Sequence, residues 1–199
     1  MNQAHLEVLA SEEWRQTLRD LALPFAFGAL SVDDLGADVL EIGPGPGLTT
    51  ELLAPQVPHL TSVEIDPALA HSLAERMSGR NVEVVEADAT AMPFPDGRFT
   101  GAITLTMFHH VPTAELQDAL LTDVLRVLRP GGVLIASDSV ASEDLERFHE
   151  DDTYNPIDPS TCAARLGRIG YVDVDVAVNP YAWSCRARRA LLDDGESVS

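Results

Sequence analysis

The chain has 199 residues, of which 45% are hydrophobic and 23% charged, and these values are ordinary for one globular domain with a substantial core. Its formal net charge is −19, and all 13 basic residues are arginine. A field of this sign repels nucleic acids and anionic membranes, so neither is expected as a partner, although simple solubility also explains the acidity.

The remaining bulk signals favour a cytoplasmic protein. Cys162 and Cys185 show neither metal-type nor disulfide-type spacing. The N-terminal segment lacks a basic region followed by an apolar stretch, so no signal peptide is expected. The longest apolar run, residues 21–30, is shorter than the about 20 residues that span a bilayer.

A helical lid or cap is expected over residues 1–30. Ser11 can cap a helix whose apolar residues, from Trp14 to Phe25, recur at helical spacing. Pro24 is expected to end or kink this helix. Packing into the core explains the aromatic residues of this segment as well as a lid does.

Strands and helices alternate across residues 39–137, which we expect to form a cofactor-binding core. Strands are expected at 39–42, 60–65, 82–87, 99–105 and 133–137, and helices at 48–54, from Asp66-Pro67 to Gly79, and from Thr113 to the turn RPGG. A parallel crossover needs a dozen or more residues, so this alternation predicts a parallel sheet.

Residues 138–192 are expected to form an acceptor-side loop, a helix and a hairpin. Asp158-Pro159 has the signature of a helix start, and strands at 171–178 and 182–189 are joined by so short a turn that they must be antiparallel. The tail, 193–199, is expected to be disordered. The prediction is one α/β domain with a doubly wound, mostly parallel seven-stranded sheet and an antiparallel C-terminal strand.

The first candidate site is the loop GPGPG, residues 43–47, after the first strand. Its glycines permit close approach of a ligand, but its two prolines have no N–H to offer a phosphate. Glu41 would repel a pyrophosphate and attract an ammonium. Leu48 stands where a dinucleotide fingerprint needs a small residue, so a dinucleotide fits poorly. A tight turn without a ligand is the other interpretation.

Carboxylates follow the next two strands. Glu64 can accept hydrogen bonds from both ribose hydroxyls of a nucleoside, or it can be a solvated strand-end charge. Asp66 is explained as a helix cap. Asp88-Ala89 suits the amino group of an adenine, although Asp88 alone reads equally well as a loop acid.

Four segments, EIGPGPG, VEID, EADATAMPFPDGRF and LRVLRPGG, resemble in order and spacing the class I S-adenosylmethionine-dependent methyltransferases with the Rossmann-like fold. They look most like the small-molecule branch that includes the quinone-biosynthesis methyltransferases. The resemblance covers about 39–137 and implies cofactor contacts from Glu41, Gly43, Gly45, Gly47, Glu64, Ile65, Asp88, Ala89, Leu105 and Thr106. The family's usual aspartate at the second strand is a glutamate here.

The resemblance implies methyl transfer from S-adenosylmethionine to a small-molecule acceptor, with S-adenosylhomocysteine as product. Positioning of the acceptor can supply much of the catalysis. Where the acceptor must lose a proton, His109 and His110 are the candidate catalytic bases, although a packed histidine pair is the simpler interpretation. Asp138, just after the fifth strand, is a weaker candidate for the base and is expected to be a solvated loop acid.

No metal site is expected. The segment 148–159, FHEDDTYNPIDP, carries oxygen and nitrogen ligands but no pair of histidines at helical spacing, so a loop over the acceptor pocket is preferred. A nicotinamide-dependent oxidoreductase and an S-adenosylmethionine-binding protein without transfer activity are the alternative functions. Monomer and homodimer are both left open.

Overall fold

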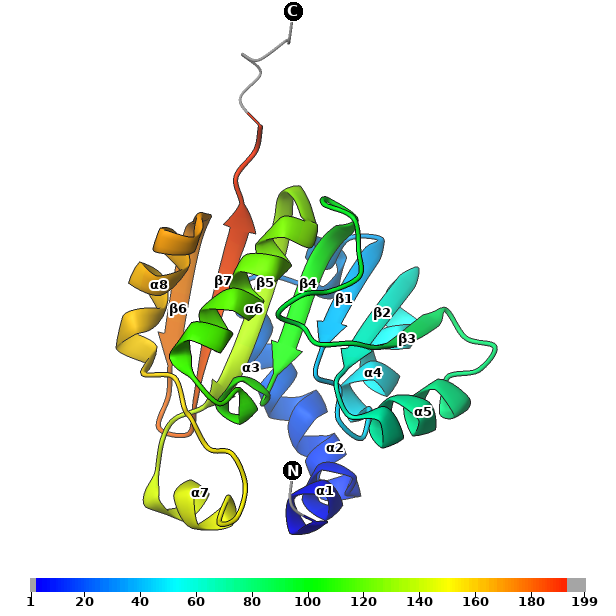
Figure 1. Ribbon diagram of the computed structural model, residues 1–199, viewed down its shortest axis with the longest axis vertical. Helices are drawn as coiled ribbons and strands as arrows, with labels where there is room; N and C mark the ends of the chain where they lie inside the picture. The colour runs from blue at the N-terminus through cyan, green and yellow to red at the C-terminus, as the bar shows by residue number, and fades with distance from the viewer. Residues whose placement is uncertain (1–2, 193–199) are drawn as a thin grey trace, which may run out of the picture.

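A seven-stranded sheet forms the middle layer of the protein in the computed structural model, which describes residues 3–192 (Figure 1). The strand order is β3-β2-β1-β4-β5-β7-β6. The strands are β1 Asp38–Ile42, β2 His59–Glu64, β3 Val82–Glu86, β4 Phe99–Leu105, β5 Leu128–Ser139, β6 Tyr171–Val178 and β7 Ala182–Arg189. Strands β1 to β5 pair in parallel, and β7 runs antiparallel to both of its neighbours. The predicted sheet is confirmed.

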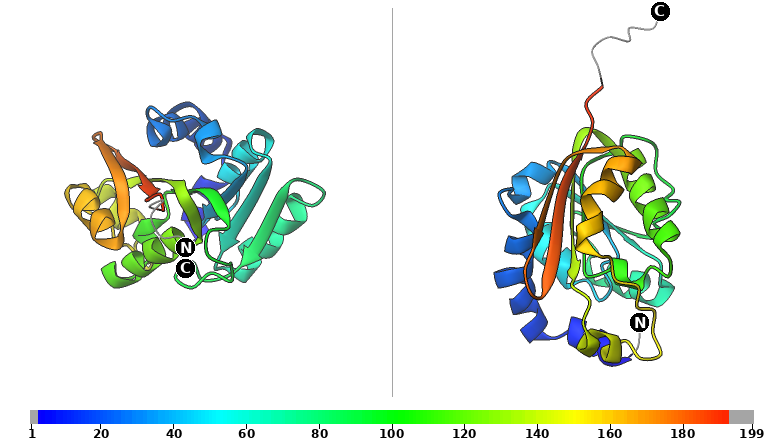
Figure 2. Two further views of the ribbon diagram at one scale, coloured as in Figure 1. Left: turned by 90° about the horizontal axis from the view of Figure 1, so that it is seen from above. Right: turned by 90° about the vertical axis from the view of Figure 1, so that its left-hand side faces the viewer.

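Helices cover both faces of this sheet. The α-helices are α1 Gln3–Leu9, α2 Glu12–Thr17, α3 Leu23–Phe27, α4 Leu48–Leu53, α5 Pro67–Arg76, α6 Ala114–Val127, α7 Glu143–Phe148 and α8 Cys162–Ile169. The N-terminal helices lie on one side of the sheet, and α6 and α8 lie on the other (Figure 2). No helix within residues 3–192 has the length and apolar character needed to cross a membrane.

The alternation of strand side chains divides the core into two layers. Leu40 and Leu134 pack in the layer beneath α6 and α8, whereas their chain neighbours Val39 and Ile135 pack in the layer beneath the N-terminal helices and α4. Both faces of the central strands are therefore buried, as expected of a parallel sheet covered on both sides.

The N-terminal helical path continues past Pro24, so of the two outcomes expected at this proline, an end or a kink, the structure contradicts the end. Ser11 does cap α2, because its Oγ accepts a hydrogen bond of 3.1 Å from the Trp14 N–H. A π-helical segment, η1 Leu18–Ala22, then widens the path immediately before α3. Pro24 consequently falls in the first turn of α3, where a missing N–H costs little.

Two elements depart from the prediction: one strand begins earlier than expected, and one helix was not expected. Strand β5 begins at Leu128, directly after α6, and the RPGG segment forms its irregular first part, with a register shift opposite β4. Helix α7 was not predicted, because its six residues are too few to show a period; Ser142 caps it by accepting from the Leu145 N–H at 3.2 Å. The predicted disordered tail, 193–199, lies outside the described residues.

Candidate active site

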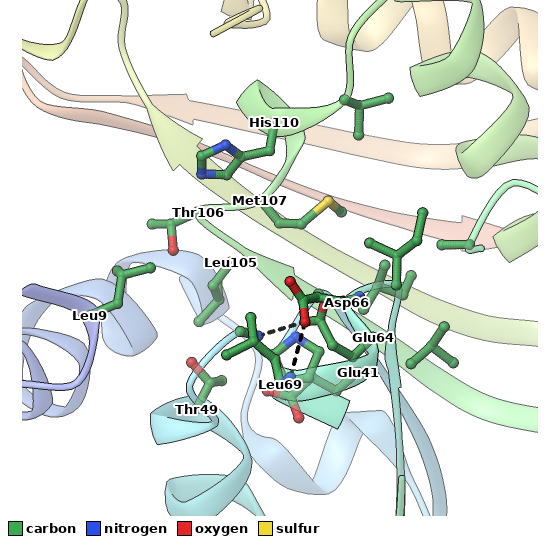
Figure 3. A pocket seen from close by; sticks show the side chains of 18 of the residues that line it. Leu9, Glu41, Thr49, Glu64, Asp66, Leu69, Leu105, Thr106, Met107 and His110 are labelled. Carbon is green, nitrogen blue, oxygen red and sulfur yellow. Dashed lines mark hydrogen bonds between the residues drawn. The ribbon is translucent and has the colours of Figure 1, made fainter. Parts of the chain in front are cut away.

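A cavity of about 460 Å³ opens at the carboxyl ends of β1, β2 and β4 (Figure 3). This edge is where parallel α/β sheets bind their ligands. The predicted cofactor residues that line it are Glu41, Gly43, Gly45, Glu64, Ile65, Asp88, Ala89, Leu105 and Thr106. Gly47 does not line the cavity. Gly47 is the N-cap of α4 and has a φ of 89°, and a Cβ at this position would lie 2.3 Å from a methyl group of Leu73.

The backbone N–H groups of the three loop glycines are all used within the protein. The Gly43 N–H donates to the Val63 carbonyl at 2.9 Å, and the Gly47 N–H donates to the Pro44 carbonyl at the same distance. The Gly45 N–H donates to Oε2 of Glu64, also at 2.9 Å. The loop thus binds a carboxylate of its own chain, and its glycines keep no N–H for a phosphate.

Gly43 also allows a close side-chain approach. Its φ is +63°, and a Cβ at this position would lie 2.2 Å from Cγ of Met107. Met107 follows β4 and lines the cavity, although the sequence did not single it out. The absence of a Cβ at Gly43 therefore leaves room for Met107, which lies between the two ends of the cavity (Figure 3).

Glu41 is a buried carboxylate with one oxygen satisfied. Its Oε2 accepts hydrogen bonds from the hydroxyls of Thr50 at 2.6 Å and Ser62 at 2.7 Å. Its Oε1 has no hydrogen-bond partner among residues 3–192. Burial raises the pKa of Glu41 to about 7, and the charge of Glu64 adds to the rise. A cation placed at Oε1 would stabilise the ionised form.

Glu64 connects the glycine loop to the next helix. It is 5% exposed, and its Oε1 accepts from the Asp66 N–H at 3.0 Å. Each carboxylate oxygen has a second lone pair, so Glu64 can still accept hydrogen bonds from a ligand in the cavity. The capping role expected for Asp66 is confirmed, because its Oδ1 accepts from the N–H groups of Ala68 and Leu69.

The candidate adenine contacts lie at the outer side of the cavity. Asp88 is exposed, and its Oδ1 accepts from the N–H and the hydroxyl of Thr90, both at 2.8 Å. Ile65 is 66% exposed, which is unusual for so large an apolar side chain. An aromatic ring packed on Ile65 would remove that surface from water.

The chain after β4 is strained where it enters the cavity. Thr106 has a φ of 51°, in the left-handed region that non-glycine residues rarely occupy. Its N–H donates to the Ser137 carbonyl at 2.8 Å, which holds this conformation. Strain of this kind is typical of functional sites.

The two candidate bases have different surroundings. His110 lines the cavity, and Figure 3 places it at the end opposite Glu41 and Glu64. Burial lowers the pKa of His110 to about 3, with the neighbouring His109 contributing. His109 is 3% exposed and hydrogen-bonds through Nδ1 to Oδ1 of Asp138 at 2.7 Å. Asp138 is 2% exposed within β5, so the expectation of a solvated loop acid is wrong.

The rest of the cavity wall is largely apolar. It includes side chains from the N-terminal helices and from α6, namely Leu6, Leu9, Trp14, Leu18, Leu116 and Leu120. The segment after α7 contributes Asp152 and Thr153. Sequence periodicity marked several of these residues as apolar but could not distinguish a cavity wall from the core.

Comparisons with known proteins agree with this geometry. A family model described as a methyltransferase domain matches residues 40–136. An rRNA adenine N-6-methyltransferase of Saccharopolyspora erythraea is 56% identical over 68 residues, which are 33% of this chain and 18% of that protein. A fatty-acid O-methyltransferase of Mycolicibacterium smegmatis is 31% identical over 122 residues, 60% of this chain and 43% of that protein. This chain spans less than half the length of either relative.

The fold extends the likeness across nearly the whole chain. A SAM-dependent methyltransferase from Aquifex aeolicus superposes with a TM-score of 0.72 at 18% identity, covering 94% of this chain and 98% of that one. The quinone-biosynthesis branch stays a prediction. Residues 40–136 therefore match a methyltransferase domain, and the chain has the Rossmann-like fold of S-adenosylmethionine-dependent methyltransferases.

Proposed function

We propose that this protein transfers a methyl group from S-adenosylmethionine to a small, largely apolar acceptor. One observation carries the proposal: the unpartnered, buried Oε1 of Glu41 lies beside a glycine loop that keeps no N–H for a phosphate. An ammonium satisfies this carboxylate, whereas a pyrophosphate would be repelled by it. The site therefore favours an amino-acid cofactor over a nicotinamide dinucleotide.

The wall of the cavity supports the acceptor class. Apolar side chains from α1, α2 and α6 line the cavity, which suits an acceptor that leaves water on binding. The net charge of −19 opposes docking on RNA. The match to the rRNA methyltransferase covers only a third of this chain, so it supports the domain more than the substrate.

Positioning is the main catalytic contribution that we assign to the protein. Bound S-adenosylmethionine supplies a methyl group already activated by its sulfonium. Glu41 and Glu64 would hold the cofactor at one end, while Thr106 and Met107 would border the acceptor. Of the two base candidates only His110 lines the cavity, and its low pKa makes it a weak base at neutral pH.

Calorimetry separates the two cofactor classes. Titration with S-adenosylhomocysteine is expected to release heat and saturate at one ligand per chain, while NAD gives no heat. Saturable binding of NAD without binding of S-adenosylhomocysteine would refute the proposal.

Methyl transfer is tested with radiolabelled S-adenosylmethionine and two acceptor pools, a small-metabolite extract and purified ribosomal RNA. Label is expected in the organic-soluble small molecules. Label in the RNA would overturn the acceptor class, and cofactor binding without label in either pool would favour the binding protein without transfer activity.

A further inference from the structure

Four of the six histidines of the chain meet at the end of the cavity that lies opposite Glu41. They are His5 in α1, His109 and His110 in the short helix η4 Phe108–His110, and His149 directly after α7. One ring nitrogen of each lies within 4.8 Å of the others. The ring centroids of His109 and His110 are 4.2 Å apart, and those of His5 and His149 are 4.7 Å apart. We call this group the histidine cluster.

Two of these rings are held in a defined orientation. The Nδ1–H of His109 donates to the Asp138 carboxylate, and the Nδ1–H of His149 donates to the Leu145 carbonyl, both at 2.7 Å. Each ring therefore carries its lone pair on Nε2. Histidines that bind metals are held in this way, with the second nitrogen donating to a carboxylate or a carbonyl.

The Nε2 atoms of His109, His110 and His149 are buried and have no hydrogen-bond partner among the described residues. His109 and His149 are each 3% exposed. A buried ring nitrogen without a partner is costly, and three of them on adjoining rings need a common explanation. One cation between the rings, accepting a lone pair from each of these nitrogens, would explain all three.

The charges around the cluster suit a dication. Two carboxylates lie next to the rings: Oδ1 of Asp138 is 2.7 Å from Nδ1 of His109, and Oδ1 of Asp152 is 3.9 Å from Nδ1 of His110. A divalent ion bound by the four imidazoles would balance these two carboxylates.

We propose that His5, His109, His110 and His149 together bind one divalent transition-metal ion. Imidazole ligands suit zinc, copper, nickel and iron and exclude calcium and magnesium as the natural occupant. Nitrogens around a tetrahedral zinc lie about 3.4 Å apart, so modest rotations of the rings must draw the farthest pair together. Four protein ligands fill a tetrahedral shell, so the ion would have a structural role. It would hold together the segments that lie over the cavity.

The elements that the ion would join are those that cover the acceptor end. Helices α1 and α7 lie side by side at the carboxyl edge of the sheet (Figures 1 and 2), and the rings of His5 and Phe148 are 5.0 Å apart. Leu6 and Leu9 of α1 line the cavity, as do Asp152 and Thr153 after α7. An ion between His5 and His149 would therefore fix both sides of the cover.

The test uses the full chain without a polyhistidine tag, stripped of metal by a chelator. Calorimetric titration with zinc is expected to give one ion per chain. Cobalt(II) is expected to give the intense visible absorption of a tetrahedral nitrogen site, a readout that needs no variant. His149→Gln should weaken zinc binding at least about 100-fold, in line with the loss of one first-sphere ligand.

Matched variants distinguish zinc binding at the histidine cluster from non-specific zinc binding at the surface. His71→Gln, on an exposed histidine of α5, should leave the zinc affinity unchanged. Asp138→Asn keeps all four imidazoles and should lower the affinity by about 10–100-fold, because it removes the carboxylate that orients His109. Zinc should also raise the melting temperature of the wild type and protect α1 from limited proteolysis.

No saturable zinc binding by the wild type, or an unchanged affinity in both His149→Gln and Asp138→Asn, would overturn the inference. Titration of the same samples with S-adenosylhomocysteine reports whether each protein is folded. Binding of S-adenosylhomocysteine without binding of zinc would remove the metal site and leave the proposed methyl transfer standing.

Discussion

Burial shifts the pKa values at the two ends of the cavity in opposite directions. At one end, burial raises the pKa of the Glu41 carboxyl to about 7. At the other, burial lowers the pKa of His110 to about 3. Both changes favour the neutral form, since a low-dielectric surrounding disfavours charge whatever its sign. Each end also has a buried atom without a hydrogen-bond partner among residues 3–192. We infer that the carboxylate end binds an ammonium and the histidine end a metal ion.

The ends also differ in how the chain builds them. The carboxylate end uses one loop and the adjoining ends of β1 and β2, with a hydrogen bond from Gly45 to Glu64 joining them. The histidine end gathers side chains from α1, from η4 and from the residue after α7, and the two most distant of them, His5 and His149, are 144 positions apart in the sequence. The first is therefore held together by hydrogen bonds within one loop and two strand ends, whereas the second depends on how two short helices dock.

The largest effect is expected from Glu64→Ala at the carboxylate end. The change removes the acceptor that we propose for the ribose hydroxyls and leaves the Gly45 and Asp66 N–H groups without their acceptor, so affinity for S-adenosylhomocysteine should fall about 100-fold. Glu86→Ala, its exposed register partner on β3, is the control and should bind normally. Calorimetry measures both. Zinc binding should be the same in both variants, and a loss of zinc binding in Glu64→Ala would show that the two ends are not independent.

Glu41→Gln should remove a pH dependence of cofactor binding. In the wild type the free carboxyl has a pKa of about 7, and a bound ammonium would lower it, so binding releases a proton. Affinity for S-adenosylhomocysteine should therefore rise with pH by up to about tenfold per unit below pH 7 and level off above it. Gln cannot ionise, so its curve should be flat from pH 5 to 7.

The Glu41 prediction has an internal control. The amino group of the ligand itself titrates at alkaline pH with both proteins, so the difference between the two curves isolates Glu41. Parallel curves for wild type and Glu41→Gln would contradict the assignment of Glu41 to the ammonium.

The smallest effect is expected from Gly43→Ala, which acts between the two ends. Both Gly43 and Gly79 have a positive φ, so alanine at either should cost about 1 kcal/mol of unfolding free energy. Only at Gly43 would the new Cβ displace Met107; at Gly79 it would meet no described atom within 4 Å. Gly43→Ala alone should weaken cofactor binding, by roughly fivefold, the equivalent of about 1 kcal/mol. Denaturant unfolding and calorimetry measure the two quantities, and equal binding by both variants would show that Met107 is not positioned by Gly43.

Much of the carboxylate end could be read from the sequence because its signals are local. Hydrophobic strands, turn residues and caps act within a few residues, and parallel strands bring their carboxyl ends to one edge whatever their side chains. That is why Glu41, Glu64 and Asp88 could be assigned to one site before the fold was known. The sequence could not show that Gly47 is needed for packing against Leu73, because a glycine needed for packing looks the same as one needed for a ligand.

The histidine cluster could not be read in this way. His109 and His110 were recognised as candidate bases and His149 as part of an acceptor-side loop, but His5 carried no signal at all. No two of them stand at a spacing that marks a metal site. Asp138 was misjudged because burial at the end of β5 depends on what β7 and η4 pack against it.

The alternation of strands and helices, the poor fit of the GPGPG loop to phosphate and the acids at the strand ends follow from local sequence. The folded chain was needed to show that the Gly45 N–H donates to Glu64, that Met107 lies against Gly43, and that His5 and His149 meet the His109–His110 pair. The difference lies in the range of the interactions. Propensity and hydrogen-bond chemistry act over a few residues, whereas the meeting of α1, η4 and α7 depends on the strand order and on the docking of the whole N-terminal segment.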